Sequence, residues 1–209
     1  DIKNTTVTDN IYGGGNNGST GGTITTDIKN TTIAANAYGG GNNGDALSDV
    51  SLSFDTVSVN AIYGGGNNAD VGGKIDLIVH NATVNDNIYG GGNVGVTEGT
   101  ITTDIKNTTV TNNIYGGGNN GNVGQNVTLP VDNISVNAIY GGGNNADVGG
   151  NIELTIDNAT VNDNIYGGGN VGVTTGSITT DIKNTTVTDN IYGGGNNGDV
   201  GDDVTLSID

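Results

Sequence analysis

Tyrosine is the residue of this sequence whose regular spacing points most directly to a chemical role. Eight tyrosines each open a Tyr-Gly-Gly-Gly-Asn sequence and follow one another at intervals of 25 or 26 residues. A phenol combines two apolar faces with a hydroxyl group that donates and accepts hydrogen bonds. If the preceding apolar residue points into a core, the tyrosine points outward, and the phenols form a ladder beside a nearly bare strip of glycines. Such a ladder would offer a binding surface to a glycan or to a second filament, and its candidate residues are Tyr12, Tyr38, Tyr63, Tyr89, Tyr115, Tyr140, Tyr166 and Tyr192.

The tyrosine repeats also have a purely structural interpretation. Identical residues held in register stack on one another, and such ladders stabilise a sheet without any ligand. The glycines would then satisfy only the geometry of the chain. We favour this structural interpretation and keep binding as the alternative.

Aspartates that follow the glycine runs are the candidates for metal binding. Residues 39–45 and 193–199 both read Gly-Gly-Gly-Asn-Asn-Gly-Asp and are similar to the calcium-binding repeat Gly-Gly-x-Gly-x-Asp. The glycine and aspartate offsets differ from that repeat, however, and several copies carry Ser, Val or Asn instead of the aspartate. Calcium requires several oxygen atoms that converge at a fixed geometry. We therefore expect no cofactor, with calcium as the alternative, bound through Asp45, Asp70, Asp147 and Asp199.

The same residues do not predict catalysis. Glycoside hydrolases place a pair of carboxylates at a fixed separation across the bond that they cleave, and β-helical enzymes bring such groups together with long irregular loops. The aspartates of this chain recur instead at repeated turn positions, without a basic partner or a buried acid that would tune a pKa for catalysis. We expect that the protein is not an enzyme.

Asn-x-Ser/Thr sequences recur near one position of the repeat and raise the alternative of a glycosylated edge. Asparagine also suits a tight turn, because it tolerates left-handed backbone conformations, and threonine suits a following strand. We favour the turn interpretation. The sequences begin at Asn4, Asn30, Asn81, Asn107, Asn126, Asn133, Asn158 and Asn184.

Composition limits the partners of the chain. Its 209 residues carry a formal net charge of −17 at pH 7, which disfavours nucleic acid and anionic membranes. Cys and Met are both absent, so there are no disulfides or thiolates and little to oxidise, as suits an extracellular protein. No apolar run approaches the roughly 18 residues of a membrane span.

The elements that hold the tyrosines are predicted from the apolar pattern. Ile75, Leu77 and Val79 alternate with polar residues, and Ala82 and Val84 continue the alternation before the next tyrosine. A period of two indicates strands, and a repeat of this length indicates a solenoid. We therefore predict an all-β, parallel β-helix of about eight coils with 25–26 residues and three short strands per coil.

We expect one domain over residues 1–209, because a repeat array grows lengthwise without dividing into globules. Tyr12 and Tyr89 are 77 residues apart, and the same step recurs along the chain, so three coils form a larger repeat. Residues 207–209 stop at the coil position that residues 1–3 occupy, and neither end carries a cap. Uncapped strand edges recruit further strands, so we expect end-to-end association, unless the chain is a fragment.

The Tyr-Gly-Gly-Gly-Asn-Asn-Gly motif and the Val/Ile alternation after it resemble the glycine-rich repeat regions of large bacterial surface proteins and adhesins. The resemblance covers the whole chain and implies an extracellular β-helical stalk or fibre. It carries no ligand or catalytic residue onto any position. We therefore expect a structural module of a surface protein, with an adhesin-type glycan-binding module as the alternative.

Overall fold

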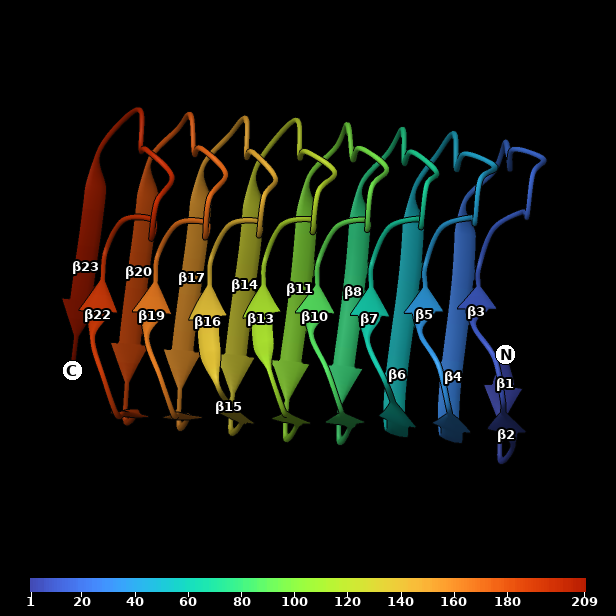
Figure 1. The fold of residues 1–209 in the computed structure, drawn as a ribbon, viewed down its shortest axis with the longest axis horizontal. Helices are drawn as coiled ribbons and strands as arrows, with labels where there is room; N and C mark the ends of the chain where they lie inside the picture. Colours follow the sequence, from blue (N-terminus) through green and yellow to red (C-terminus); the bar gives the residue numbers. More distant parts are fainter.

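A computed structural model describes residues 1–209 and contains strands, turns and no helix. The chain winds through about eight turns of a parallel β-solenoid, with its N and C termini at opposite ends of a rod (Figure 1). Every strand pairing is parallel. The predicted fold class is therefore confirmed.

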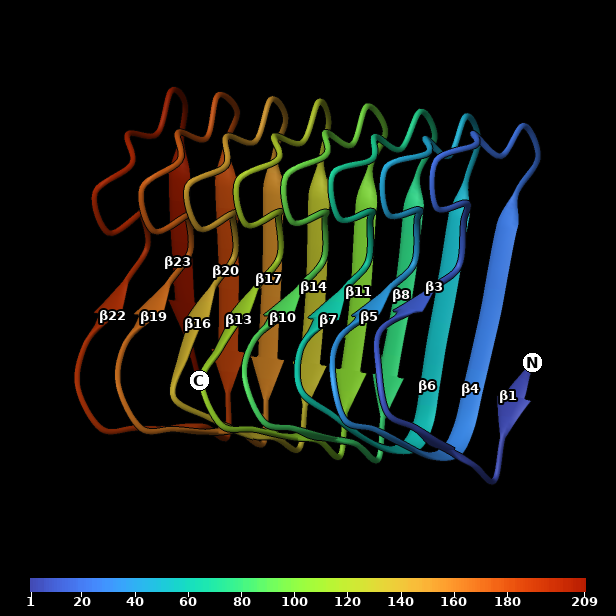
Figure 2. The ribbon, with the colours of Figure 1, turned by 45° about the vertical axis from the view of Figure 1, so that its right-hand side comes forward.

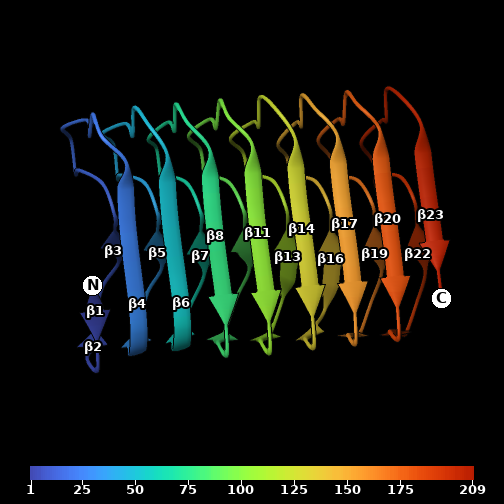
Figure 3. The same ribbon diagram turned by 180° about the vertical axis from the view of Figure 1, so that it is seen from behind.

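The longest strands form one face of the solenoid and stand side by side along the rod (Figure 3). Two of these strands, β4 (Ile24–Ile33) and β6 (Val50–Val59), bend at a corner of the coil and continue into a second face of the solenoid. The long strands are β4 (Ile24–Ile33), β6 (Val50–Val59), β8 (Ile75–His80), β11 (Ile101–Lys106), β14 (Val127–Asp132), β17 (Ile152–Asp157), β20 (Ile178–Lys183) and β23 (Val204–Ile208), and the two-residue strand β1 (Ile2–Lys3) pairs with β4 on the same face.

The second face consists of two-residue strands that belong to the same 15-stranded sheet. These are β2 (Thr6–Val7), β9 (Thr83–Val84), β12 (Thr109–Val110), β15 (Ser135–Val136), β18 (Thr160–Val161) and β21 (Thr186–Val187).

The third face is a separate 8-stranded sheet made of the strands that end in tyrosine. Figure 2 shows this sheet opposite the long strands. Its strands are β3 (Ile11–Tyr12), β5 (Ala37–Tyr38), β7 (Ile62–Tyr63), β10 (Ile88–Tyr89), β13 (Asn113–Tyr115), β16 (Ala138–Tyr140), β19 (Ile165–Tyr166) and β22 (Ile191–Tyr192).

The core lies between these faces and consists of aliphatic columns that run along the rod. Ile75, Leu77 and Val79 are at most 1% exposed, and Ala82 and Val84 are also buried. Residues that share a coil position pair in register from coil to coil, as Leu129 does with Leu154. The period-two pattern therefore identified the inward positions correctly.

One corner of the coil depends on asparagine. Seven asparagines and one threonine have φ between 47° and 58°, in the left-handed region, which asparagine visits more readily than most residues. The residues are Asn4, Asn30, Thr56, Asn81, Asn107, Asn133, Asn158 and Asn184. Seven of the eight predicted Asn-x-Ser/Thr sequences thus begin at this turn, which gives the asparagine a conformational reason to be there.

Pro130 interrupts one ladder. The N–H of Val127 donates to the carbonyl of Asn151 in the next coil, so the nitrogen of Pro130, three residues later, lies on the side of β11. Proline has no N–H to donate there. The β11–β14 register accordingly skips Pro130, whereas on its other side Pro130 pairs with Thr155. Pro130 therefore costs the β11–β14 ladder one backbone hydrogen bond.

Candidate functional site

The eight tyrosines form one continuous stack along the rod. Successive ring centroids lie 4.8–4.9 Å apart, and successive ring planes differ by 5–10°. The isoleucines beside them belong to the main core, whereas the tyrosines form a second, separate cluster. Alternation along each strand therefore places the phenols on the outer side of the 8-stranded sheet, as the outward ladder requires.

Burial changes what this ladder presents to a ligand. Tyr38, Tyr63, Tyr89, Tyr115, Tyr140 and Tyr166 are only 5–9% exposed. Each ring covers the faces of its neighbours at stacking distance. Tyr192, in the last coil, is 45% exposed. The ladder is therefore a closed aromatic stack along most of its length, with an open ring face at its C-terminal end.

Asparagine side chains contact the phenol hydroxyls at two places in the stack. The side-chain amide of Asn36 donates to the hydroxyl of Tyr38 at 3.3 Å, and that of Asn113 donates to the hydroxyl of Tyr115 at 3.2 Å. Both asparagines precede their tyrosine by two residues, so they lie on the same side of the strand. They anchor the hydroxyl edge of the stack.

The stack also changes the acidity of the phenols. Burial, followed by the charge of Tyr38 on the neighbouring coil, raises the pKa of Tyr63 to about 12. Burial and the neighbours Tyr115 and Tyr166 raise the pKa of Tyr140 to about 12 in the same way. These phenols are protonated and neutral at physiological pH, so they act there as hydrogen-bonding and stacking groups rather than as bases.

The middle glycine of each internal Tyr-Gly-Gly-Gly sequence is required by the approach of the next coil. A Cβ atom on Gly91 would lie 2.9 Å from the backbone nitrogen of Gly118, and one on Gly117 would lie 2.8 Å from the nitrogen of Gly143. Such contacts are closer than real side chains make. The glycine strip is therefore part of the packing between coils as well as a bare surface.

The asparagine after the glycines forms a second unbroken ladder, which the sequence analysis did not identify. Each side-chain amide donates to the side-chain oxygen of the preceding coil at 2.8–2.9 Å. The recurrence of this asparagine in every repeat was the feature of the sequence that could have predicted the ladder. The members are Asn16, Asn42, Asn67, Asn93, Asn119, Asn144, Asn170 and Asn196.

The candidate metal ligands bind backbone N–H groups of neighbouring coils. The carboxylate of Asp45 accepts from the N–H of Asp70 at 3.0 Å, that of Asp70 accepts from Val96 at 2.7 Å, and that of Asp147 accepts from Val173 at 2.8 Å. Asp199 lies in the exposed last coil. No group of three or more Asp, Glu or His side chains is arranged to hold a metal ion. Calcium binding through these four residues thus stays an untested alternative.

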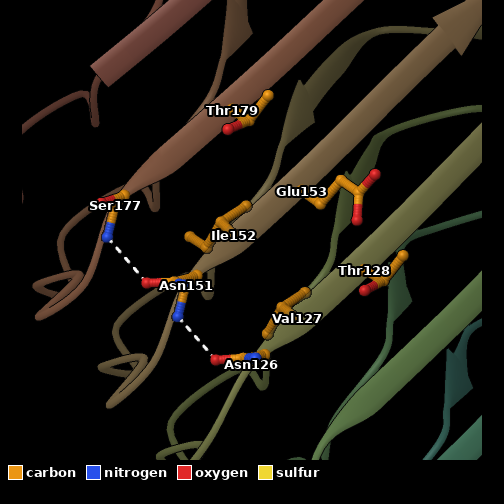
Figure 4. Close-up of a pocket in the computed structure, with 8 residues that line it drawn as sticks. All are labelled: Asn126, Val127, Thr128, Asn151, Ile152, Glu153, Ser177 and Thr179. Carbon is orange, nitrogen blue, oxygen red and sulfur yellow. Dashed lines mark hydrogen bonds between the residues drawn. The ribbon is translucent and has the colours of Figure 1, made fainter. Parts of the chain in front are cut away.

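A shallow polar groove lies on the outer surface of β14, β17 and β20 (Figure 4). The N–H of Asn151 donates to the side-chain oxygen of Asn126 at 2.9 Å, and the N–H of Ser177 donates to that of Asn151 at 3.0 Å. Hydroxyl, amide and carboxylate groups therefore line the groove and can hydrogen-bond to a polar ligand. Its lining residues are Asn126, Val127, Thr128, Asn151, Ile152, Glu153, Ser177 and Thr179.

Comparison of the chain with protein-family models, with curated proteins and with solved structures finds no match. Among the elements of the structure there is no helix with the length and apolarity needed to span a membrane.

Proposed function

We propose that this chain is a structural repeat module of an extracellular surface protein and acts as a stalk, sheath or head-to-tail filament. The observation that carries the proposal is the tyrosine stack, which runs from Tyr12 to Tyr192 at intervals of 4.8–4.9 Å without a break. A constant interval makes the length of the rod proportional to its number of coils. Duplication of near-identical repeats then lengthens the rod, which is the property that we expect selection to act on.

Stiffness along the axis follows from the bonding between coils. The N–H of Gly90 donates to the carbonyl of Tyr115 at 2.9 Å, and the N–H of Asn119 donates back to Gly92 at 3.0 Å. Aliphatic, tyrosine and asparagine columns run beside these bonds. Bending the rod would strain all of these columns together, so the module suits a spacer that holds two points apart.

The charged groups support a hydrated surface. All five lysines form ion pairs with an aspartate two residues away in the sequence, with N···O distances of 2.6–3.2 Å. The remaining acidic groups leave the formal net charge at −17. Like charge keeps neighbouring rods apart in solution, as suits a densely displayed extracellular protein.

An adhesin-type binding module is the second candidate. It is favoured by the outward direction of the tyrosine ladder and by the hydroxyl-lined groove on β14, β17 and β20. A glycan would contact the hydroxyl edges of the stack or the groove rather than the faces of the buried rings. In this case, replacing outward polar residues abolishes binding while the fold survives.

Antibodies raised against the purified chain test the proposed location, and small-angle scattering tests the shape. We expect the antibodies to label intact cells of the source organism, and we expect the scattering of dilute chain to fit a rod about 38 Å long at a strand spacing of about 4.8 Å. Labelling only after the cells are permeabilised would contradict the surface role. A particle much longer or much shorter than this would contradict the rod.

A further inference from the structure

Every ring of the tyrosine stack carries a hydroxyl group, although stacking requires only an aromatic ring. All eight repeats have Tyr at this position, and the one Phe of the chain, Phe54, lies in the aliphatic core. Phe in the stack would present the same two faces to its neighbours without a polar atom at the edge of the ring. Packing between the coils therefore leaves the eight hydroxyl groups unexplained.

The hydroxyl groups lie where the stack meets water. Asparagine side chains donate to two of them, in Tyr38 and Tyr115. The hydroxyl oxygen of Tyr89 has no hydrogen-bond partner within the protein, yet it is not among the buried polar atoms that lack one, so it contacts solvent. The same holds for Tyr63, Tyr140 and Tyr166. A phenol of the stack can thus release its proton to water although its ring faces are covered.

Tyrosine is also the side chain from which this protein gives up an electron most readily. Cys and Met, the side chains on which oxidation usually falls, are absent, and so is Trp. A radical that removes one electron from the protein therefore leaves the vacancy, or hole, on a phenol. Because an internal phenol such as Tyr89 lies between two others, a neighbouring ring is in place to fill that hole.

We propose that the tyrosine stack carries one-electron holes along the rod, from phenol to phenol. At every one of its seven intervals the ring centroids are 4.8–4.9 Å apart and the planes are within 10° of parallel. The internal rings are 5–9% exposed, which keeps dissolved molecules away from their faces while a hole passes. This activity goes beyond the proposed stalk and does not depend on it.

Each step of the transfer balances in electrons and protons. An oxygen-centred or metal-centred one-electron oxidant takes an electron from a phenol, whose proton passes to water, and a neutral phenoxyl radical remains. The next phenol gives this radical an electron and loses its own proton to water, while the first oxygen takes a proton back. One O–H bond is broken and the other is restored. The hole leaves the stack when a dissolved one-electron reductant, such as an enediol, donates an electron and a proton to a phenoxyl radical.

The acidity of the phenols couples the two particles. Burial raises the pKa of Tyr63 to about 12, and the charges of Tyr38 and Asp86 contribute. Burial likewise raises the pKa of Tyr140 to about 12. At neutral pH each phenol therefore starts with its proton and must lose it together with the electron. The transfer should be slower in heavy water than in ordinary water for this reason.

Flash photolysis of the full chain, with an oxidant and a trap at chosen positions, tests the relay. The chain has no cysteine, so Asn85→Cys, at an exposed side chain just before β10, can carry a single ruthenium polypyridyl photo-oxidant. Tyr166→3-aminotyrosine supplies the trap, because an aminophenol is oxidised more readily than a phenol. The trap lies three stacking intervals beyond Tyr89. We expect a flash, with a soluble electron acceptor present, to produce the aminotyrosyl radical after the phenoxyl radical.

Phenylalanine within the path interrupts the relay and keeps the rings. Tyr115→Phe combined with Tyr140→Phe forces the hole to cross three intervals in one step, so the aminotyrosyl signal should be lost. Tyr12→Phe combined with Tyr38→Phe is the matched control outside the path and should leave the signal unchanged. Tyr140→Phe alone, at a hydroxyl with no partner in the protein, should delay the signal without lowering the unfolding midpoint.

Three results would overturn the relay. They are a trap signal that survives both substitutions in the path, a native path that gives no delayed signal, and an arrival time that is the same in heavy water. None of them bears on the stalk, because the length and location of the rod are measured separately.

Discussion

The phenol rings of Tyr89 and Tyr115 lie 4.9 Å apart between centroids and within 5° of parallel. Both rings are 5% exposed, and both stack on a further tyrosine on their other side. Tyr89→Ala removes two stacking contacts and leaves a gap in the ladder. We expect a loss of about 3–5 kcal/mol in the free energy of unfolding, as for other large aromatic residues truncated in a core, measured by urea denaturation.

Tyr192→Ala is the control for that change. Tyr192 stacks on Tyr166 alone and is 45% exposed. In dilute solution at low salt it should cost about 1–2 kcal/mol, because a half-buried side chain loses less transfer free energy and one stacking contact. Equal costs for the two variants would contradict a contribution from both the greater burial of Tyr89 and its second stacking contact.

The asparagine ladder should stabilise the turn after each glycine run. Asn119 donates to Asn93 and accepts from Asn144, both at 2.9 Å. Asn119→Ala leaves one donor and one acceptor without partners, which costs about 1–3 kcal/mol where these groups are buried. Asn197→Ala, at an exposed residue of the last coil, should change the free energy of unfolding by less than about 0.5 kcal/mol.

Thr103 is a buried residue at which a substitution should raise the stability of the fold. Its side chain is fully buried, and its hydroxyl oxygen has no hydrogen-bond partner. Thr103→Val keeps the shape and removes the unpaired group, so we expect it to stabilise the protein by about 1–3 kcal/mol. Thr102→Val, on the exposed face of the same strand, should have little effect. A destabilised Thr103→Val would show that a water or another group satisfies the hydroxyl.

Alkaline pH should unfold the rod, because the buried tyrosine hydroxyls lose their protons. Burial raises the pKa of Tyr63 and of Tyr140 to about 12, above the unfolded value of about 10. The stability linked to these phenols is therefore complete below pH 10 and is lost as the pH rises towards 12. Phenolate absorbance and circular dichroism should change together in this range. Phenolate formation near pH 10 without loss of structure would contradict the effect of burial.

Chelation tests the calcium alternative. The carboxylates of Asp70 and Asp147 already accept backbone N–H groups, so we expect the unfolding midpoint to be the same with calcium and with EDTA. Asp70→Asn should also be tolerated, because Asn122 accepts an equivalent bond from Asp147 at 2.9 Å. Collapse of the fold in EDTA would establish calcium as a structural cofactor.

The sequence was sufficient to predict the core, because the period of two at Ile75, Leu77 and Val79 carries through to buried columns. It left the direction of the tyrosines open, because two adjacent apolar residues of each strand compete for the core. It did not predict their burial, because a ring at 4.9 Å from two others is covered by residues 25 or 26 positions away. The asparagine ladder was missed for the same reason, since the partners of Asn119 lie in neighbouring coils.

Cryo-electron microscopy of the purified chain in the presence of chelator tests the central claim most directly, because it measures how the length of the particles is distributed. The stalk or filament role requires straight rods whose lengths are multiples of about 38 Å, the length of eight coils at a strand spacing of about 4.8 Å. Compact particles, or rods whose lengths bear no relation to that unit, would contradict it.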